Sequence, residues 1–537
     1  MKRFVLYCFI VLAVHNTVMG QIKRDPRSVA MANAYTTIAD GFFAVGYNPA
    51  MLAYQQDKPF MLQLFGFDMG LSGNFISLEN LNSLSGDTLY AEGENPRNPN
   101  DNSKDRLFRQ FQDAGGLAFA QNIHLPLPVI NYSSGNMAFT SNLVWMSNIV
   151  FPLGILELLF YGNGKRPELD MTFNLEVFGI NELGFTFAVP YDRFAIGVTV
   201  KYLQGLFYFG VDPDSSRAPL VTSDYHVYGS GKYLFRFGVG GSGLGLDLGF
   251  VTKEYNGFRA GVALINALGV IEWNKQGLMK DLVAGPDATM GTEDDVFNPA
   301  AFLGFPAINE YQAISYEYTI DSLNAAGMSE SSVFTSEPFK AVDNRDPNDP
   351  DKPKEFKTRY PAIFRAGVSY TNELFIISSD LWTGFSNQFY AHAGWRGSVG
   401  FEFLKFKNIP LRLGYAFGGP TFKELGLGFG YHIGPLIFDF GFAFKNGVWI
   451  HSMQGLNLSL QLTMTSFKGR DSKPAAPSDG PAPLPEDAAT TDEEPVEGSE
   501  SNGESSEEPV EGSGSNGESS EEPTKDAEPD SDDSLSG

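Results

Sequence analysis

The stretch Leu436 to Lys445, LIFDFGFAFK, decides the fold class. Every second residue is large and apolar, and these residues are Leu436, Phe438, Phe440, Phe442 and Phe444. The residues between them include Asp439, Gly441, Ala443 and Lys445, which are small or charged. Because side chains alternate across a strand, one face is suited to hydrocarbon and the other to a polar interior. The pattern predicts one strand of a membrane-spanning wall.

The same alternation recurs along the chain, which indicates a wall of many strands. It is found at 194–202, where Lys201 lies on the polar face, at 244–250, with Asp247, and at 411–417, with Arg412. A soluble sandwich or barrel also has half-buried strands that alternate, with polar residues facing water. We therefore weigh two classes of all-β protein, one in a membrane and one in solution.

The start of the chain favours export. Lys2 and Arg3 precede an apolar run from Phe4 to Val14, and small residues end at Gly20, which is typical of a signal peptide over residues 1–20. This run is too short for a bilayer of ~30 Å, and no later segment offers the ~20 apolar residues of a membrane helix. Without such a helix, a spanning chain must close into a barrel. The single cysteine, Cys8, lies in the leader, so the mature chain has no disulfide and no thiolate site.

Composition separates the chain into a body, residues 21–467, and a tail, residues 468–537. The 46 Phe, 22 Tyr and 58 Gly of the whole chain suit a lipid-facing wall with aromatic girdles. The tail holds 21 acidic and four basic residues, so most of the net charge of −26 belongs to it. A 14-residue unit from Glu493 recurs from Glu507, with Glu500 replaced by Gly514. Such a composition predicts a disordered tail that acts as a solvated spacer or binds basic partners or cations.

We expect about 14 to 16 spanning strands, an even number being usual for single-chain bacterial barrels. The candidate segments are 60–68, 71–78, 136–145, 172–178, 182–189, 193–203, 233–239, 244–251, 258–266, 311–320, 361–370, 373–382, 394–404, 409–417, 423–431, 435–444 and 454–465. The intervals 79–115, 146–170, 272–310 and 321–360 are polar or irregular and are expected to form extracellular loops or segments folded into the lumen. The last strand ends near Phe467, and this terminal Phe is similar to the signal read by barrel assembly machinery.

Three segments near the N-terminus resemble the opening of a known group of outer-membrane proteins. They are Ala30-Met31-Ala32-Asn33-Ala34-Tyr35, Ile38-Ala39-Asp40 and Tyr47-Asn48-Pro49-Ala50-Met51-Leu52-Ala53. The group comprises relatives of long-chain fatty-acid transporters and type IX secretion barrels, in which a glycine-rich turn leads to an Asn-Pro-Ala signature. Here Ala32 and Asn33 stand in place of the glycines. Later motifs, Asn181 to Gly184, Val200 to Gly205, Leu246 to Gly249 and Asn266 to Trp273, are similar to a subfamily of unassigned function.

The resemblance implies that residues 21–55 enter the lumen as a hatch. The hatch or gate candidates are Asp40, Asn48, Pro49 and Ala50. Pro49 holds Asn48 extended, and the Asn48 amide is able to bond the local backbone. The tripeptide is thus interpretable as a structural corner or as a gate, and its residue types favour the corner.

Alternation also predicts which charges face the lumen. They are Lys201, Asp247, Arg259, Arg365, Glu402, Arg412, Asp439 and Lys445. Both signs are present, so these residues either pair and brace the interior or line a route for an anionic head group.

Other chemistry has little support in the sequence. One loop, Gly285 to Asp295, carries Asp287, Glu293, Asp294 and Asp295, and clustered carboxylates on a glycine-containing turn suit Ca²⁺ or a solvated loop. No metalloprotease spacing or glycine-flanked nucleophilic Ser is present, so we expect no enzyme and no other cofactor. Scattered basic residues in an acidic chain exclude a nucleic-acid interface.

The sequence therefore predicts an all-β transmembrane antiparallel barrel in the bacterial outer membrane, with a plug-like N-terminal segment and a periplasmic acidic tail. We expect passive transport of hydrophobic or amphipathic small molecules. The alternative is a non-transporting barrel that serves as a docking or structural partner in protein secretion or surface attachment. The expected partners are outer-membrane lipid, the barrel assembly machinery, and either a hydrophobic ligand or a secretion partner.

Overall fold

The protein was analysed as a computed structural model. The structure describes residues 25–466, with the exceptions of 56–59, 76, 78–88, 114, 163–166, 213, 224–226, 274–312, 324–339, 342–344, 347–348, 354–355, 387–392, 407, 420–422, 448 and 450. The chain divides into two units, residues 1–476 and residues 477–537. The leader, Phe467, the acidic tail and the candidate calcium residues Asp287, Glu293, Asp294 and Asp295 lie outside the described residues.

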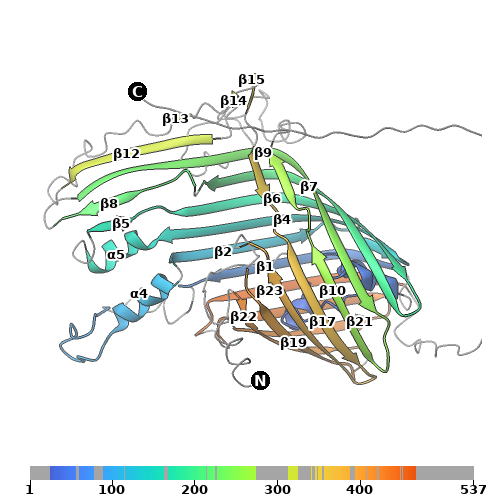
Figure 1. Ribbon diagram of the computed structural model, residues 1–537. Coiled ribbons are helices and arrows are strands. Elements are labelled where there is room, and N and C mark those ends of the chain that lie inside the picture. The colour runs from blue at the N-terminus through green and yellow to red at the C-terminus, as the bar shows by residue number, and fades with distance from the viewer. Residues whose placement is uncertain are drawn as a thin grey trace, which may run out of the picture. The chain divides into compact units, whose positions relative to one another are not determined.

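Fourteen antiparallel strands form a closed barrel, in which each strand pairs with the next and the last pairs with the first (Figure 1). They are β1 (Phe60–Gly73), β2 (Gly116–Pro126), β4 (Met137–Pro152), β6 (Asn174–Pro190), β7 (Phe194–Val211), β9 (Val227–Thr252), β10 (Phe258–Ile265), β17 (Ile363–Thr371), β18 (Phe375–Gly384), β19 (Arg396–Phe403), β20 (Leu411–Gly418), β21 (Lys423–Ile433), β22 (Leu436–Lys445) and β23 (Gly455–Thr465). This confirms the predicted fold class and falls within the predicted strand number.

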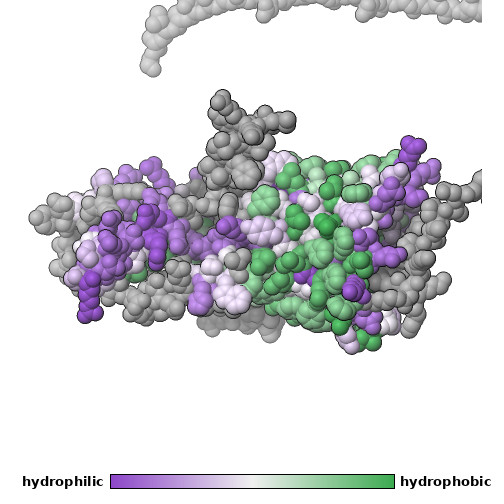
Figure 2. All heavy atoms as spheres, turned by 90° about the horizontal axis from the view of Figure 1, so that it is seen from below, coloured by the Kyte–Doolittle hydropathy of each residue, from purple (hydrophilic) through white to green (hydrophobic). Residues whose placement is uncertain are grey.

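Side-chain alternation explains why these segments form a closed wall. In β22, Leu436 and Phe438 are exposed on the outer face, whereas Ala443 and Lys445 are buried on the inner face. Strand β23 repeats this order, with Asn457, Ser459, Gln461, Thr463 and Thr465 buried. Figure 2 shows the apolar outer residues gathered in a band with hydrophilic residues on either side of it. Closure leaves this ring of strands without an open edge.

The wall is taller on one side of the barrel than on the other. Strand β9 has 26 residues, whereas β19 and β20 have 8 residues each. The first half of β9 pairs with β12 (Ala313–Leu323) and β8 (Pro219–Thr222), and its second half pairs with β10. Phe209, Phe235 and Phe237 are buried in an apolar cluster of this tall part, which also contains Ala218 just before β8.

Several smaller strands complete the structure. Strand β3 (Tyr132–Ser134) bridges β1 and β4, and β11 (Val270–Trp273) joins β9 to β16 (Phe356–Arg359). Strand β5 (Glu168–Asp170) pairs with β8, and β13 (Lys340–Ala341) pairs with β12. Strands β14 (Arg345–Asp346) and β15 (Asp349–Pro353) form a separate two-stranded sheet.

Some predicted strand boundaries were wrong. The segment 60–68 and residues 71–73 of the segment 71–78 belong to the single strand β1. Residues 174–178 of the segment 172–178 and the segment 182–189 belong to β6, and 233–239 and 244–251 belong to β9. In β9 the glycine-rich run continues the pairing with β7, and Gly240 adopts φ +75° without a steric penalty. Strand β2 was missed because Gln121 interrupts its outer apolar face. Residues 313–320 of the predicted segment 311–320 lie in β12, which is not one of the closing strands.

Two helices form in intervals that were predicted to be irregular. They are α4 (Ser103–Asp113), between β1 and β2, and α5 (Leu153–Tyr161), between β4 and β6. Leu107, Phe108 and Phe111 of α4 pack with Leu156 of α5 in a small apolar cluster. Among the described residues, no helix has the length and hydropathy required to cross a membrane.

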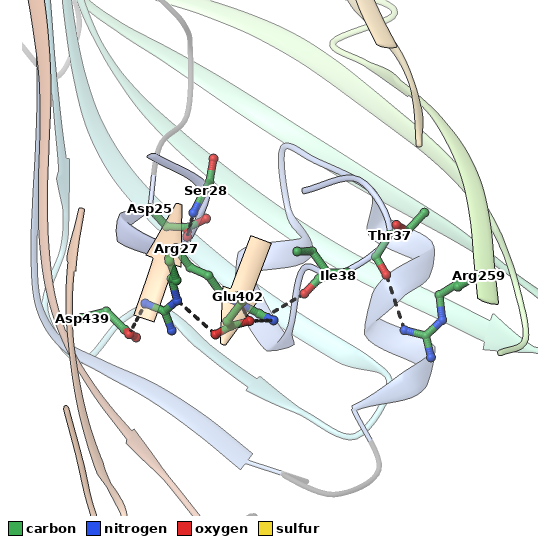
Figure 3. A network of polar contacts seen from close by, with 9 residues as sticks. Asp25, Arg27, Ser28, Thr37, Ile38, Arg259, Glu402 and Asp439 are labelled. Carbon is green, nitrogen blue, oxygen red and sulfur yellow. Dashed lines mark hydrogen bonds and ion pairs between the residues drawn. The ribbon is translucent and has the colours of Figure 1, made fainter. Parts of the chain in front are cut away.

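The N-terminal segment, residues 25–55, lies inside the barrel wall (Figures 1 and 3). It consists of α2 (Pro26–Ala30), η1 (Gly41–Ala44) and η2 (Pro49–Tyr54), and most of its side chains are buried. The apolar side chains of this segment form a cluster with Met61, Ala138, Ala195 and Val251 of the wall. From here on we call residues 25–55 the inner segment.

Candidate functional site

Local sequence determines how the inner segment turns. Asp25 and Asn48 each precede a proline, and the side chains of these two residues accept hydrogen bonds from Ser28 N at 2.9 Å and Ala50 N at 3.1 Å. Such N-caps with a following proline start short helices. Ala32 and Asn33 adopt φ values of 48° and 69°, the left-handed region that glycine favours. They thus form a tight turn without a glycine.

The Asn48-Pro49-Ala50 corner rests against β7 and β9. Asn48 Nδ2 donates to the Phe250 carbonyl at 3.2 Å. Gly197 and Gly249 face the corner, and a Cβ atom at either position would clash with Pro49, Ala50 or Asn48. These glycines are therefore required for close approach of the two backbones.

A first charge cluster ties the inner segment to β19, β20 and β22 (Figure 3). The Glu402 carboxylate accepts from Arg27 Nη2 at 2.6 Å and from Arg412 Nε at 3.0 Å. Arg412 Nη1 also donates to Asp439 Oδ1 at 2.6 Å, and Arg27 Nη1 donates to the Ile38 carbonyl at 2.9 Å. Two arginines and two carboxylates thus form one network, in which Glu402 and Arg412 are buried and Arg27 and Asp439 are partly buried.

A second cluster is centred on Asp380 of β18. Its Oδ2 accepts from the Tyr35 and Thr36 backbone nitrogens, both at 2.9 Å, and from Thr36 Oγ1 at 2.6 Å. Arg365 Nη2 lies 3.0 Å from the same oxygen and donates to the Asn33 carbonyl at 2.7 Å. Asp380 and Arg365 are both almost fully buried, so the wall holds the inner segment through a dry ion pair.

A third cluster lies on β6, β7 and β9. Lys201 Nζ lies 2.9 Å from Asp247 Oδ2 and 3.6 Å from Glu182 Oε2, and it donates to Asn266 Oδ1 at 2.8 Å. Tyr360 Oη donates to Glu182 Oε2 at 2.8 Å. Ion pairs and hydrogen bonds thus connect these groups across neighbouring strands of the wall.

The remaining predicted residues have looser or different surroundings. Arg259 Nη1 is 3.4 Å from the Thr37 carbonyl, and its Nη2 is 3.5 Å from Glu254 (Figure 3). Lys445 is buried and lies opposite Glu424 in the register of β21 and β22. Asp40 precedes η1 and lines a cavity of about 30 Å³ together with Arg412 and Asp439.

Burial also fixes the protonation of a phenol within the inner segment. The Tyr47 hydroxyl donates to Ser28 Oγ at 2.7 Å. Burial, and then the nearby Asp25 carboxylate, raises the pKa of Tyr47 well above its ordinary value. The phenol therefore remains a neutral hydrogen-bond donor.

An apolar layer lies farther along the strands than the inner segment. On β18 it begins two residues beyond Asp380, at Trp382, and on β7 it includes Leu203, beyond Lys201. We call this layer the lumen cluster; its buried members are Val144, Met146, Phe178, Ile180, Leu203, Tyr208, Ala263, Ile265, Ile271, Trp273, Tyr360, Ile363 and Trp382, with Phe356 packed against them. Phe178 meets Tyr360 edge-on at 6.4 Å between ring centroids. The described lumen thus has a zone around the inner segment that combines apolar packing with buried charge clusters, and an apolar zone beyond it.

Some site residues were missed by sequence reasoning. Asp380 and Glu182 are buried partners of the predicted lumen cations Arg365 and Lys201, and the missed pair of Glu424 and Arg396 is buried as well, with Arg396 Nη2 donating to Glu424 Oε2 at 2.5 Å. The sequence contained a signal for these residues, because each one occupies an inward-facing position in the alternation of its strand. Asp68 and His124, whose Oδ2 and Nδ1 atoms are 2.9 Å apart, were missed because β2 was not recognised. Among the described residues no group of three or more His, Cys, Asp or Glu side chains is arranged to hold a metal ion.

Comparisons with known proteins give one family match over part of the chain and several solved structures of β-barrels. Residues 49–235 match the model of a family of unknown function (DUF5723). No curated protein matches the chain. The similar solved structures include the *P. putida* toluene transporter TodX, with 10% identity, TM-score 0.42, and coverage of 82% of this chain and 98% of that chain.

Two further solved structures show the same range of similarity. The CymD monoaromatic hydrocarbon channel has 12% identity, TM-score 0.43, and coverage of 84% of this chain and 99% of that chain. The translocator domain of the autotransporter NalP from *Neisseria meningitidis* has 6% identity, TM-score 0.26, and coverage of 76% and 88%. Similarity this low carries no inference about what this chain binds.

Proposed function

We propose that this protein is an outer-membrane barrel that passes hydrophobic or amphipathic small molecules by passive transport. The observation that supports this function is the order of the two zones in the lumen. A cargo that enters from the tall end of the wall meets the apolar lumen cluster before it reaches the inner segment. The inner segment then acts as a hatch, which must shift for the cargo to continue.

The lengths of the links between strands at the two ends of the barrel support an orientation of the barrel in the outer membrane. Short links join β6 to β7 (191–193), β9 to β10 (253–257), β17 to β18 (372–374) and β21 to β22 (434–435), all at one end. Short turns are typical of the periplasmic side of outer-membrane barrels, and longer loops of the extracellular side. We place the hatch and the acidic tail at the periplasmic side. Outer-membrane lipid and the barrel assembly machinery are the partners that this location implies.

The hatch candidates have separate roles in this proposal. The Asn48-Pro49-Ala50 corner positions the hatch on β7 and β9, and Asp40 lies at the seam with β20 and β22. The charges Arg365, Glu402, Arg412 and Asp439 hold the hatch closed. Lys201, Asp247 and Lys445 brace the wall, and Arg259 makes a weaker contact with the hatch.

The filled lumen also supports a second candidate function. A barrel that is closed by buried side chains would serve as a docking or structural partner in protein secretion or surface attachment. Its contact surface would then be the tall part of the wall, where α4, α5 and β12 are found.

Conductance and uptake measurements distinguish these functions. The purified protein would be placed in lipid bilayers and compared with a chain that lacks residues 21–55, using ion conductance and the uptake of a fluorescent amphipathic probe. Uptake by the intact chain, or conductance that appears on deletion, supports the gated transporter. If both chains remain heat-modifiable barrels on gels and neither passes ions or probe, transport is excluded and the docking function is retained.

A further inference from the structure

Three buried polar side chains on neighbouring strands make no hydrogen bond through one polar atom. Ser378 and Trp382 lie on β18, and Ser398 lies on β19; their exposed fractions are 1%, 3% and 1%. Ser378 Oγ, Trp382 Nε1 and Ser398 Oγ have no hydrogen-bond partner among the described residues. We call these three residues the polar ladder. Unpaired buried donors are costly, so each such group requires an explanation.

Some comparable groups elsewhere in the same lumen are paired, whereas others, such as Ser133 Oγ and Thr140 Oγ1, are not paired within the described part of the chain. Trp273 also belongs to the lumen cluster, and its Nε1 donates to Thr358 Oγ1 at 2.9 Å. Thr186 and Thr199 bond each other through their hydroxyls at 2.8 Å on β6 and β7. The barrel thus contains two buried indoles that can be compared. The N–H group of Trp273 is hydrogen-bonded, and that of Trp382 is not.

The polar ladder connects the two zones of the lumen. Trp382 belongs to the lumen cluster, and Ser398 lies opposite Asp380 in the register of β18 and β19. Asp380 is the residue that holds Tyr35 and Thr36 of the inner segment. A molecule that moves along this wall from the apolar zone towards the short-turn end therefore meets Trp382 first and the serines next.

The charges beside the polar ladder determine which polar group it accepts. Arg365 and Arg396 flank Trp382 on the two neighbouring strands, but they are already paired with Asp380 and Glu424. Asp380 Oδ1 makes no hydrogen bond and lies on the same face as the ladder. An anionic group would meet this carboxylate without an available cation, which is unfavourable in a dry site. A pure hydrocarbon would leave the indole N–H unpaired.

We propose that the cargo is an uncharged hydrophobic molecule with a hydroxyl or carbonyl oxygen, and that Trp382, Ser398 and Ser378 bind this oxygen in turn. The inference rests on the proposed transport function and specifies its substrate class. Trp382 Nε1 donates to the oxygen, and the serine hydroxyls either donate to it or accept from a cargo hydroxyl. Fatty-acid anions and hydrocarbons without oxygen are then poorer cargo than ketones and alcohols of the same size.

Indole N–H signals provide a direct test. The chain has five Trp residues, so full-length protein with ¹⁵N-labelled tryptophan in bicelles gives a small set of indole signals. The probes are ethylbenzene, acetophenone and benzoate, which share a benzene ring and differ in the oxygen and the charge. We expect acetophenone to shift the Trp382 signal downfield, whereas ethylbenzene produces no downfield shift and benzoate does not bind. The signal is assigned as the one that disappears in Trp382→Phe.

Two variants separate recognition from packing. Trp382→Phe keeps an aromatic ring under Arg396 and removes the N–H, so the preference for acetophenone over ethylbenzene should fall about tenfold. In the matched control Trp273→Phe, this preference should be unchanged. Circular dichroism and heat-modifiable migration verify that both variants form barrels, and empty bicelles correct for partition of the probes into lipid.

The outcomes distinguish this inference from the proposed function. If ethylbenzene and acetophenone perturb the indole signals equally and Trp382→Phe does not change their ratio, the inference is wrong while transport remains supported. If benzoate binds best, the inference is also wrong, because an anion route then exists. If no probe binds and none passes the barrel, the proposed function itself fails.

Discussion

The inner segment is held by two walls of different chemistry. On the side of β17 to β22, buried charges hold it, through Asp380 with Thr36 and Glu402 with Arg27. On the side of β7 and β9, the corner at Asn48 fits against Gly197 and Gly249 with one hydrogen bond from its side chain to the Phe250 carbonyl. One wall therefore combines buried charges with close glycine contacts, such as those of Gly414 and Gly441, whereas the other holds the segment by close packing and one side-chain hydrogen bond.

This difference determines how each contact can be released. A buried ion pair is strongly destabilising when one partner is removed, because the other charge is left unpaired. A close-packed contact fails when a methyl group is added, because dense interiors tolerate little extra volume. Substitutions on the two walls should thus differ in the size and in the nature of their effects.

The largest effect is expected at Asp380. Asp380→Ala leaves Arg365 buried without its carboxylate and removes the acceptor of the Tyr35 and Thr36 amides. We expect a loss of about 3–5 kcal/mol in the free energy of unfolding. Guanidinium unfolding in lipid vesicles measures it, and limited proteolysis should cut the inner segment faster. A loss below that of the glycine substitutions would contradict the electrostatic assignment of this wall.

A smaller effect is expected at Glu402. In Glu402→Gln, Arg27 keeps the Ile38 carbonyl and Arg412 keeps Asp439, so each arginine retains a hydrogen-bond partner. We expect a loss of about 1.5–3 kcal/mol, the range of hydrogen bonds to charged groups. The same unfolding assay applies. The double variant with Arg27→Met should lose less than the sum of the two single changes, and strict additivity would show that the two side chains do not interact.

The close-packed contact of the corner with the wall is tested by a substitution at Gly249. The Cβ atom of Gly249→Ala would meet the Asn48 side chain, the Pro49 ring and the Ala50 nitrogen, so the corner must shift. We expect a cost of about 1–3 kcal/mol, typical of overpacking. Proteolysis should become faster near residue 50, whereas the ion pairs of the other wall should remain. Gly434→Ala is a comparison for backbone strain alone, because the added Cβ meets no atom within 4 Å and the cost comes from the positive φ of 56°.

Features that depend on neighbouring residues could be predicted from the sequence, whereas contacts between residues far apart in the chain could not. The alternation of LIFDFGFAFK is local, so β22 and its inward Lys445 follow from neighbouring residues alone. The contact between Arg365 and the Asn33 carbonyl joins residues 332 positions apart, and no local pattern specifies it. Asp380 has the inward parity of Ser378 and Trp382, but its choice of Thr36 depends on where the inner segment folds. Parity thus predicts which side chains face inward, and register across distant strands decides their partners.

The smallest effect is expected at Arg259, which lies between the two walls on β10. Its contact with the Thr37 carbonyl is long, at 3.4 Å, its ion pair with Glu254 is 3.5 Å, and Glu254 is 41% exposed. The guanidinium also lies 4.9 Å from the centre of the Tyr54 ring. Partly exposed pairs and cation–π contacts are each worth about 0.5–1 kcal/mol.

We therefore expect Arg259→Met to lose about 1 kcal/mol or less in guanidinium unfolding, with unchanged proteolysis of the inner segment. This result would place the limit of the electrostatic attachment at β10, since the buried charges that hold the inner segment begin with Arg365 on the next strand, whereas a close glycine contact is still found on β10 at Gly261. A loss as large as that of Asp380→Ala would instead extend the electrostatic attachment to β10.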